Sequence, residues 1–147
     1  MKILVAYDST DGAERALDTA TKIVGSNAGA VLLLRVLNPH ADAADIVAPT
    51  AAEAMQILVQ REQAAMDARL ARLAPIEGVT ATGRVEVLER QEDSGAGIAR
   101  IAEQWGADLI AIGSRRVAGL SGLLLGSVAS RVLHLTATPV VLVKPLH

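Results

Sequence analysis

Four short, nearly continuous apolar runs limit the fold of this chain more than any other feature of its sequence. They cover residues 3–7, 30–34, 108–112 and 139–143. Strands have this composition when both of their faces are covered, as in a parallel sheet. A fifth segment, residues 79–88, alternates between mostly apolar and mostly polar side chains, which is typical of an edge strand. The sequence therefore predicts four buried strands and one strand at a sheet edge.

Helical patterns separate these strands. Apolar residues recur at helical spacing over about residues 12–24, 50–73, 95–105 and 124–135. Gly25 or Asn27 can end the first helix, and Pro49 and Pro75 bound the second. Strict alternation of strands and helices is typical of a doubly wound fold, because parallel neighbouring strands require a crossover connection. We therefore predict a single α/β domain over residues 1–147, with helices on both faces of a parallel sheet.

Aromatic residues are almost absent from the chain. Tyr7 and Trp105 make up its 1% of aromatic residues, beside 51% hydrophobic residues. The core must therefore consist of Ala, Val, Leu and Ile, and stacking platforms for single-stranded bases are excluded. A net charge of -2 and a pI of about 5.9 also argue against a nucleic-acid partner. We expect Trp105, in the third helix, to report folding and to stay silent to a ligand.

The chain shows no conventional catalytic or metal centre. It has no cysteine, and His40, His134 and His147 lack the spacing of metal ligands, so we predict no catalytic residue and no metal-ligating set. We expect His134 to be partly buried or to cap its helix. The apolar run that follows Lys2 ends at Asp8, too short for a secretory signal, and no stretch approaches about 18 apolar residues. We therefore expect a cytoplasmic protein that does not enter a membrane.

Ligands of doubly wound sheets bind at the carboxyl ends of the strands, where the strand order reverses. The loops that matter are then residues 7–11, 37–42 and 113–126. The last of these carries several glycines between a buried strand and a helix. Glycines let backbone N–H groups approach an anion, and the first turn of a helix adds unpaired donors and a positive dipole end. This loop therefore predicts a phosphate-binding site, although it is neither Gly-x-Gly-x-x-Gly nor a P-loop.

Four segments together resemble the universal stress protein family, and the resemblance covers essentially the whole chain. They are ILVAYDS at residues 3–9, DLIAIGS at 108–114, LLGSVA at 124–129 and TPVVLV at 138–143. The resemblance implies a five-stranded parallel sheet of order 3-2-1-4-5 and a homodimer joined through the last strands. In many members it also implies binding of an adenine nucleotide through a Gly-x2-Gly-x9-Gly-Ser/Thr loop.

Carried over to this chain, that loop begins at Gly113 and ends at Gly126 and Ser127. Its second glycine is replaced by Arg116. The backbone there is either right-handed or left-handed at a cost of about 1–2 kcal/mol, and the side chain either occupies the pocket or supplies charge to a phosphate. Arg115 is either solvated or part of a phosphate clamp.

The resemblance also assigns residues outside that loop. Asp8 matches an acidic residue near the ribose and phosphates; its alternative role is to cap the first helix, for which Asp11 is better placed. Ala6 and Val36 match positions near the adenine, with core packing as the alternative. The full set of expected nucleotide-binding residues is Ala6, Tyr7, Asp8, Val36, Gly113, Ser114, Arg115, Arg116, Gly119, Gly126, Ser127 and Val128.

Two functions follow as hypotheses. The first is a regulatory or stress-response module that binds ATP, with Mg²⁺, and hydrolyses it slowly at most, since nothing positions a water or a general base. The alternative is a dimeric interaction protein without a nucleotide, whose glycine loop is closed by Arg116. The apolar last strand, uncharged until Lys144, independently favours a symmetric homodimer through residues 140–144, because an unpaired sheet edge is hazardous.

Overall fold

The computed structural model describes residues 1–25, 27–116 and 123–145. Its main sheet has five strands in the order β3-β2-β1-β4-β7, all of them parallel. The strands are β1 (Lys2–Ala6), β2 (Gly29–Leu37), β3 (Val79–Val87), β4 (Leu109–Gly113) and β7 (Val140–Val143). This confirms the predicted α/β class and strand order, and it places the alternating segment β3 at one edge of the sheet.

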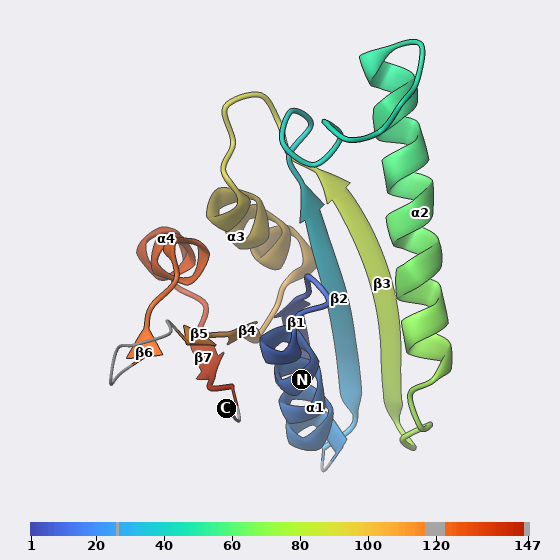
Figure 1. Ribbon diagram of the computed structural model, residues 1–147. Coiled ribbons are helices and arrows are strands. Elements are labelled where there is room, and N and C mark those ends of the chain that lie inside the picture. The colour runs from blue at the N-terminus through green and yellow to red at the C-terminus, as the bar shows by residue number, and fades with distance from the viewer. Residues whose placement is uncertain (26, 117–122, 146–147) are drawn as a thin grey trace.

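Two helices cover each face of the sheet (Figure 1). They are α1 (Asp11–Gly25), α2 (Ala51–Ala71), α3 (Ser94–Trp105) and α4 (Ser127–Leu135). The helices α1 and α2 lie on one face, and α3 and α4 lie on the other. The central strands β1 and β4 are apolar on both sides for this reason, because their middle side chains meet a helix whichever way they point.

Successive side chains of β1 enter different cores. Ile3 and Val5 pack with α1 in one buried cluster, whereas Leu4 packs with α3 and α4 in the other. The first cluster includes three alanines of α1, Ala13, Ala16 and Ala20, whose small side chains let the helix approach the sheet closely. Trp105 lies at the edge of the second cluster, where the ammonium group of Lys2 is 4.4 Å from the centre of its ring.

The fourth helix begins later than the sequence pattern predicts. Residues 123–124 form a short strand, β6 (Leu123–Leu124), which pairs antiparallel with β5 (Arg115–Arg116). The helix starts only at Ser127, after Gly126 in an extended conformation at φ -62° and ψ 158°. The leucines of residues 123–125 fit a helical period, but the backbone of the first two is paired across the loop instead.

Candidate functional site

The carboxyl ends of β1 and β4 lie side by side at the centre of the sheet. Ala6 is level with Ile112 of β4 and with Leu34 of β2, and β2 continues past that level to Leu37. From β1 the chain passes to β2 on one side, and it reaches β4 on the other side only after β3. The boundary between β1 and β4 is therefore the point where the strand order reverses, the usual ligand position in doubly wound sheets.

Asp8 lies in the turn between β1 and α1, and its carboxylate shapes that turn. Its Oδ1 accepts hydrogen bonds from the backbone N–H of Thr10, at 3.1 Å, and from the Thr10 hydroxyl, at 2.5 Å. The Thr10 hydroxyl in turn accepts from the backbone N–H of Ala13 at 3.3 Å, as an N-cap side chain does. Thr10 thus caps α1, which corrects the expectation for Asp8 or Asp11, because Asp11 already stands inside the helix.

Tyr7 and the preceding residue Ala6 are both expected binding residues, but they lie on opposite faces of the sheet. Ala6 packs beside the α3 and α4 cluster, whereas Tyr7 is buried in the cluster formed with α1. The Tyr7 hydroxyl donates to Glu14, whose carboxylate also receives a bidentate pair of hydrogen bonds from Arg69 of α2. Burial, followed by the Glu14 carboxylate, raises the pKa of Tyr7. The hydrogen bonds from Arg69 hold the pKa of Glu14 below its ordinary value.

Sequence reasoning missed Glu14 and Arg69. The two residues are 55 positions apart, and no local pattern connects an acidic residue in the first turn of one helix with a basic residue in the last turn of the next. The pairing follows only from the way in which α1 and α2 share one face of the sheet.

The expected adenine positions are both half-buried. Ala6 and Val36 pack against the cluster formed with α3 and α4. Val36 is level with Glu86 of β3 and lies near Gly97 of α3, where an added Cβ would be 3.6 Å from a Val36 methyl group. The core-packing interpretation thus applies to both residues. Both residues also lie near the carboxyl ends of adjacent strands, where a ligand is expected, so their contact with adenine stays a prediction.

Gly113 and Ser114 are held by the fold itself. A Cβ on Gly113 would come within 2.3 Å of the carbonyl carbon of Gly12, so this glycine permits the close approach of α1 to β4. Ser114 is buried, and both its backbone N–H, at 2.9 Å, and its hydroxyl, at 3.3 Å, donate to the carbonyl oxygen of Val143. Both residues therefore have a structural role whether or not a ligand binds.

The far end of the glycine loop presents the amino end of α4. Gly126 is the N-cap residue; among the described residues no side chain caps the helix there, and an added Cβ on Gly126 would meet no atom within 4 Å. Ser127 and Val128, in the first turn, are exposed. Uncapped N–H groups at a helix start, with the positive end of its dipole, favour an anion.

The two arginines of the loop belong to β5. Arg116 pairs with Leu123 and Arg115 with Leu124 in an antiparallel ladder. The backbone of Arg116 is therefore extended, which corrects the expectation of a right- or left-handed helical conformation at the missing glycine. Gly119, another expected binding residue, lies outside the described residues.

The described residues hold no group of three or more His, Cys, Asp or Glu side chains that could bind a metal ion. His134 is exposed near the end of α4, which corrects the expectation of partial burial, and its ring nitrogen lies 2.8 Å from the carbonyl oxygen of Ser130. His40 lies exposed in the loop after β2, and His147 lies beyond the described part of the chain. None of the helices described is long and apolar enough to cross a membrane.

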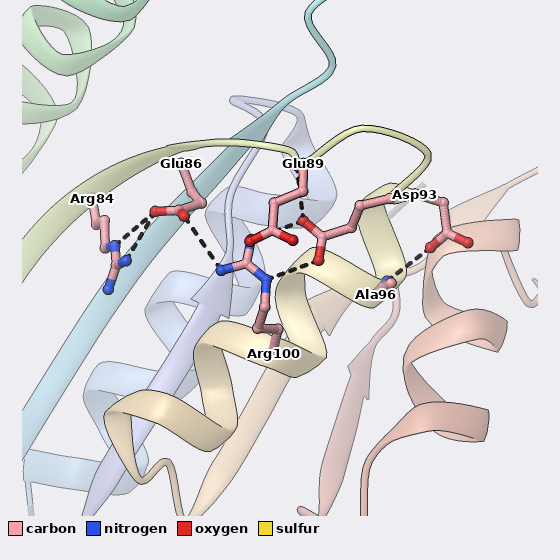
Figure 2. Close-up of polar contacts among 7 residues, drawn as sticks. Arg84, Glu86, Glu89, Asp93, Ala96 and Arg100 are labelled. Carbon is pink, nitrogen blue, oxygen red and sulfur yellow. Dashed lines mark hydrogen bonds and ion pairs between the residues drawn. The ribbon is translucent and has the colours of Figure 1, made fainter.

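A second polar cluster fixes the loop between β3 and α3 (Figure 2). Arg100 of α3 forms a bidentate pair with Glu92, with both N–O distances at 2.8 Å, and reaches Glu86 of β3 at 3.4 Å. Asp93 caps α3 through the backbone N–H of Ala96 and pairs with Arg131 of α4 at 2.9 Å. One end of this cluster reaches β3 through Glu86, and the other end reaches α4 through Asp93.

The chain thus has a doubly wound α/β fold, with Asp8 in the turn after the first strand and a glycine-containing loop after β4. Residues 1–144 match the model of the universal stress protein family. The chain belongs to this family, as the resemblance indicated. A search of the curated proteins found no significant match.

Solved structures agree with this assignment. The hypothetical protein MJ0577 is 27% identical, with a TM-score of 0.76 over 97% of this chain and 94% of its own. A universal stress protein from Archaeoglobus fulgidus in complex with dAMP is 22% identical, with a TM-score of 0.61 over 98% of both chains. A universal stress protein in complex with cAMP is also 22% identical, with a TM-score of 0.58 over 99% of this chain and 97% of its own. At such identities the last two show the shared fold.

Proposed function

We propose that this universal stress protein binds an adenine nucleotide, with ATP as the first candidate, and acts as a regulatory stress-response module in the cytoplasm. One observation carries the proposal: Asp8 and the glycine-containing loop follow β1 and β4, the adjacent strands at which the sheet order reverses. Two relatives with the same fold bind dAMP and cAMP, which share an adenine, a sugar and a phosphate.

The phosphates of the nucleotide fit the amino end of α4. Gly126 has no side chain to cap this helix, so the N–H groups of its first turn are suited to phosphate oxygens. Ser127 adds a hydroxyl to the same turn. Asp8 then contacts the ribose, and the small side chains of Ala6 and Val36 contact the adenine ring. Because no Phe is present and Tyr7 points into the core, the ring is held without aromatic stacking.

Mg²⁺ fits such a site only together with the nucleotide. Proteins commonly bind it through one or two carboxylates and the phosphates of a substrate. Asp8 is the carboxylate at the end of β1, and it supplies the hard oxygen ligands that this cation prefers. Bound there, the cation would neutralise phosphate charge. We expect hydrolysis to be slow at most, since no residue of the site is assigned as a general base.

The pairing of β5 with β6 favours a second candidate function. Arg116 stands where the family motif has glycine, and its backbone is already paired with Leu123 across the base of the loop. A loop closed in this way would bind no nucleotide, and the protein would then be a dimeric interaction protein.

Calorimetric titration with ATP and Mg²⁺ distinguishes the two functions. Three proteins are compared: the wild type, Arg116→Gly and Arg115→Gly, the last removing the neighbouring arginine without restoring the motif. The proposal predicts saturable binding, with one nucleotide per chain, by the wild type. Binding by Arg116→Gly alone would establish the second candidate, and binding by none of the three would contradict the proposal.

We also propose a homodimer through β7. This strand lies at an edge of the sheet, and its Leu142 is 39% exposed although the strand is entirely apolar. Pairing with a second copy would cover the free edge and this side chain, as expected for an exposed apolar strand.

A further inference from the structure

The Tyr7–Glu14–Arg69 cluster adjoins the turn that carries Asp8. We infer that Arg69 of α2 is a positioning residue for the nucleotide site: it holds Glu14, and through Tyr7 it fixes the turn in which Asp8 lies. This inference rests on the proposed nucleotide site and extends it to a helix that contributes none of the expected binding residues.

The geometry of the cluster is specific. The Arg69 guanidinium reaches Glu14 with Nε at 3.0 and 2.9 Å from the two carboxylate oxygens and a terminal nitrogen at 2.7 Å from Oε2. The side chain of Arg69 is 18% exposed and that of Glu14 35%. A planar guanidinium fork that grips both oxygens fixes the orientation of a carboxylate, which a single contact does not. The carboxylate of Glu14 is thereby aimed at the hydroxyl of Tyr7.

The turn is tied at both ends to the same stretch of α1. Tyr7 is bound through its hydroxyl to Glu14, and Asp8 is bound to Thr10, which caps the helix. The backbone N–H of Glu14 also donates to the carbonyl oxygen of Thr10 at 2.9 Å. Between these ties Ser9 has a φ of 65°, a left-handed conformation that L-residues adopt only when their surroundings impose it.

Tyr7 and Asp8 are consecutive residues with different roles. Tyr7 is buried on the side of α1 and α2, while Asp8, the next residue, is a proposed ligand contact. Holding the Tyr7 side chain at its hydroxyl therefore restrains the backbone from which Asp8 projects. Without Arg69, Glu14 would lose the cation that is hydrogen-bonded to it and keep only the charge of Arg72 nearby, and the tie between α1 and Tyr7 would loosen.

Arg69→Gln tests this inference, with Arg100→Gln as its matched control. Arg100 forms an equally bidentate pair with Glu92 and is 23% exposed, but it holds the loop between β3 and α3 (Figure 2). Amide hydrogen exchange is measured by NMR on the ligand-free proteins at Thr10, Ala13 and Glu14, whose N–H groups close the turn. ATP affinity is measured on the same proteins by calorimetry.

We expect Arg69→Gln to accelerate exchange at those amides and to weaken ATP binding by about threefold or more. This is the low end of the effects seen for residues that do not contact the ligand themselves. Arg100→Gln should leave exchange at those amides unchanged, even where it lowers the midpoint of unfolding equally. Tyr7→Phe, which keeps the ring in the core and removes only the hydroxyl, should repeat the effects of Arg69→Gln and covers the case in which that variant does not fold.

The outcomes separate the two proposals. Unchanged exchange, or unchanged ATP affinity in a folded Arg69→Gln or Tyr7→Phe variant, would overturn the inference and leave the proposed function standing. Absence of ATP binding in the wild type would overturn the proposed function and, with it, the positioning role.

Discussion

Gly113 shows how one residue type can serve both the fold and the expected ligand. Its lack of a side chain matches the first glycine of the family loop, yet the nearest atoms to an added Cβ belong to Gly12 of α1, at 2.3 to 2.8 Å. Those atoms are backbone, so they cannot move aside as a flexible side chain would. A glycine in this loop is therefore no evidence by itself for phosphate binding.

The substitution Gly113→Ala should destabilise the protein by about 1–3 kcal/mol, the usual cost of forcing an extra group into a packed core. Gly126→Ala is the control: among the described residues its Cβ would meet nothing within 4 Å, so it should cost only the N-cap preference for glycine over alanine, about 0.5 to 1 kcal/mol. Urea unfolding measures both. Equal stabilities of the two variants would contradict the contact between α1 and β4.

Glu14 should make the free energy of unfolding of the protein depend on pH in the acidic range. Its pKa is lowered in the folded state from an ordinary 4.5, chiefly by Arg69, so its contribution is complete above that value and is lost as the pH falls through the folded pKa. The stability difference between the wild type and Glu14→Gln should therefore shrink as the pH falls below the ordinary pKa of 4.5. Urea unfolding at several pH values gives this difference, and a constant difference would refute the assignment.

Alternation along β1 explains what the sequence could and could not predict about single residues. The positions of Ala6, Tyr7 and Asp8 at the end of a buried strand were predictable from the apolar run and its abrupt end. The contact of Tyr7 with Glu14 and Arg69 was not, because it depends on which helix covers which face of the sheet.

At the scale of elements, the strands were the most predictable part of the molecule. A buried parallel strand must be apolar on both sides, and each expected run overlaps a strand of the structure, although β2 continues three residues past its run to Leu37. The start of α4 was predicted wrongly because leucine fits both a helix and a strand. Only the pairing of Leu123 and Leu124 with β5 decides between them.

The cap of α3 offers a test at this scale. Asp93 accepts from the backbone N–H of Ala96 at 2.8 Å, so Asp93→Ala should cost about 1 kcal/mol of stability. Asp93→Asn keeps a capping oxygen and loses only an exposed ion pair with Arg131, so it should cost clearly less. Trp105 fluorescence during urea unfolding measures both variants, because Trp105 ends the same helix. A larger loss in Asp93→Asn than in Asp93→Ala would be inconsistent with the cap.

For the whole molecule, the position of β7 at the sheet edge leads to a prediction about assembly. Light scattering should give the wild type twice the chain mass of 15.3 kDa at micromolar concentration, and Leu142→Lys should give a single chain. A lysine on an edge strand hinders pairing with another chain. Ile57→Lys is the control, because Ile57 is equally exposed at 39% but lies on α2. A monomeric wild type would contradict the proposed dimer.

The strand order of the whole sheet followed from the family resemblance, and the expected ligand position followed from that order. The loop of residues 113–126 was recognisable from its glycines, whereas the antiparallel pairing of β5 with β6 within it was not predicted. The binding of a nucleotide by this site stays a prediction.

A crystal structure of the wild type grown with ATP and Mg²⁺ tests the central claim most directly, because it locates the ligand as well as detecting it. The account predicts a nucleotide at the boundary of β1 and β4, with its phosphates at the first turn of α4 and its ribose near Asp8. A structure in which this edge of the sheet is empty at saturating ATP, or in which the nucleotide lies elsewhere, would contradict it.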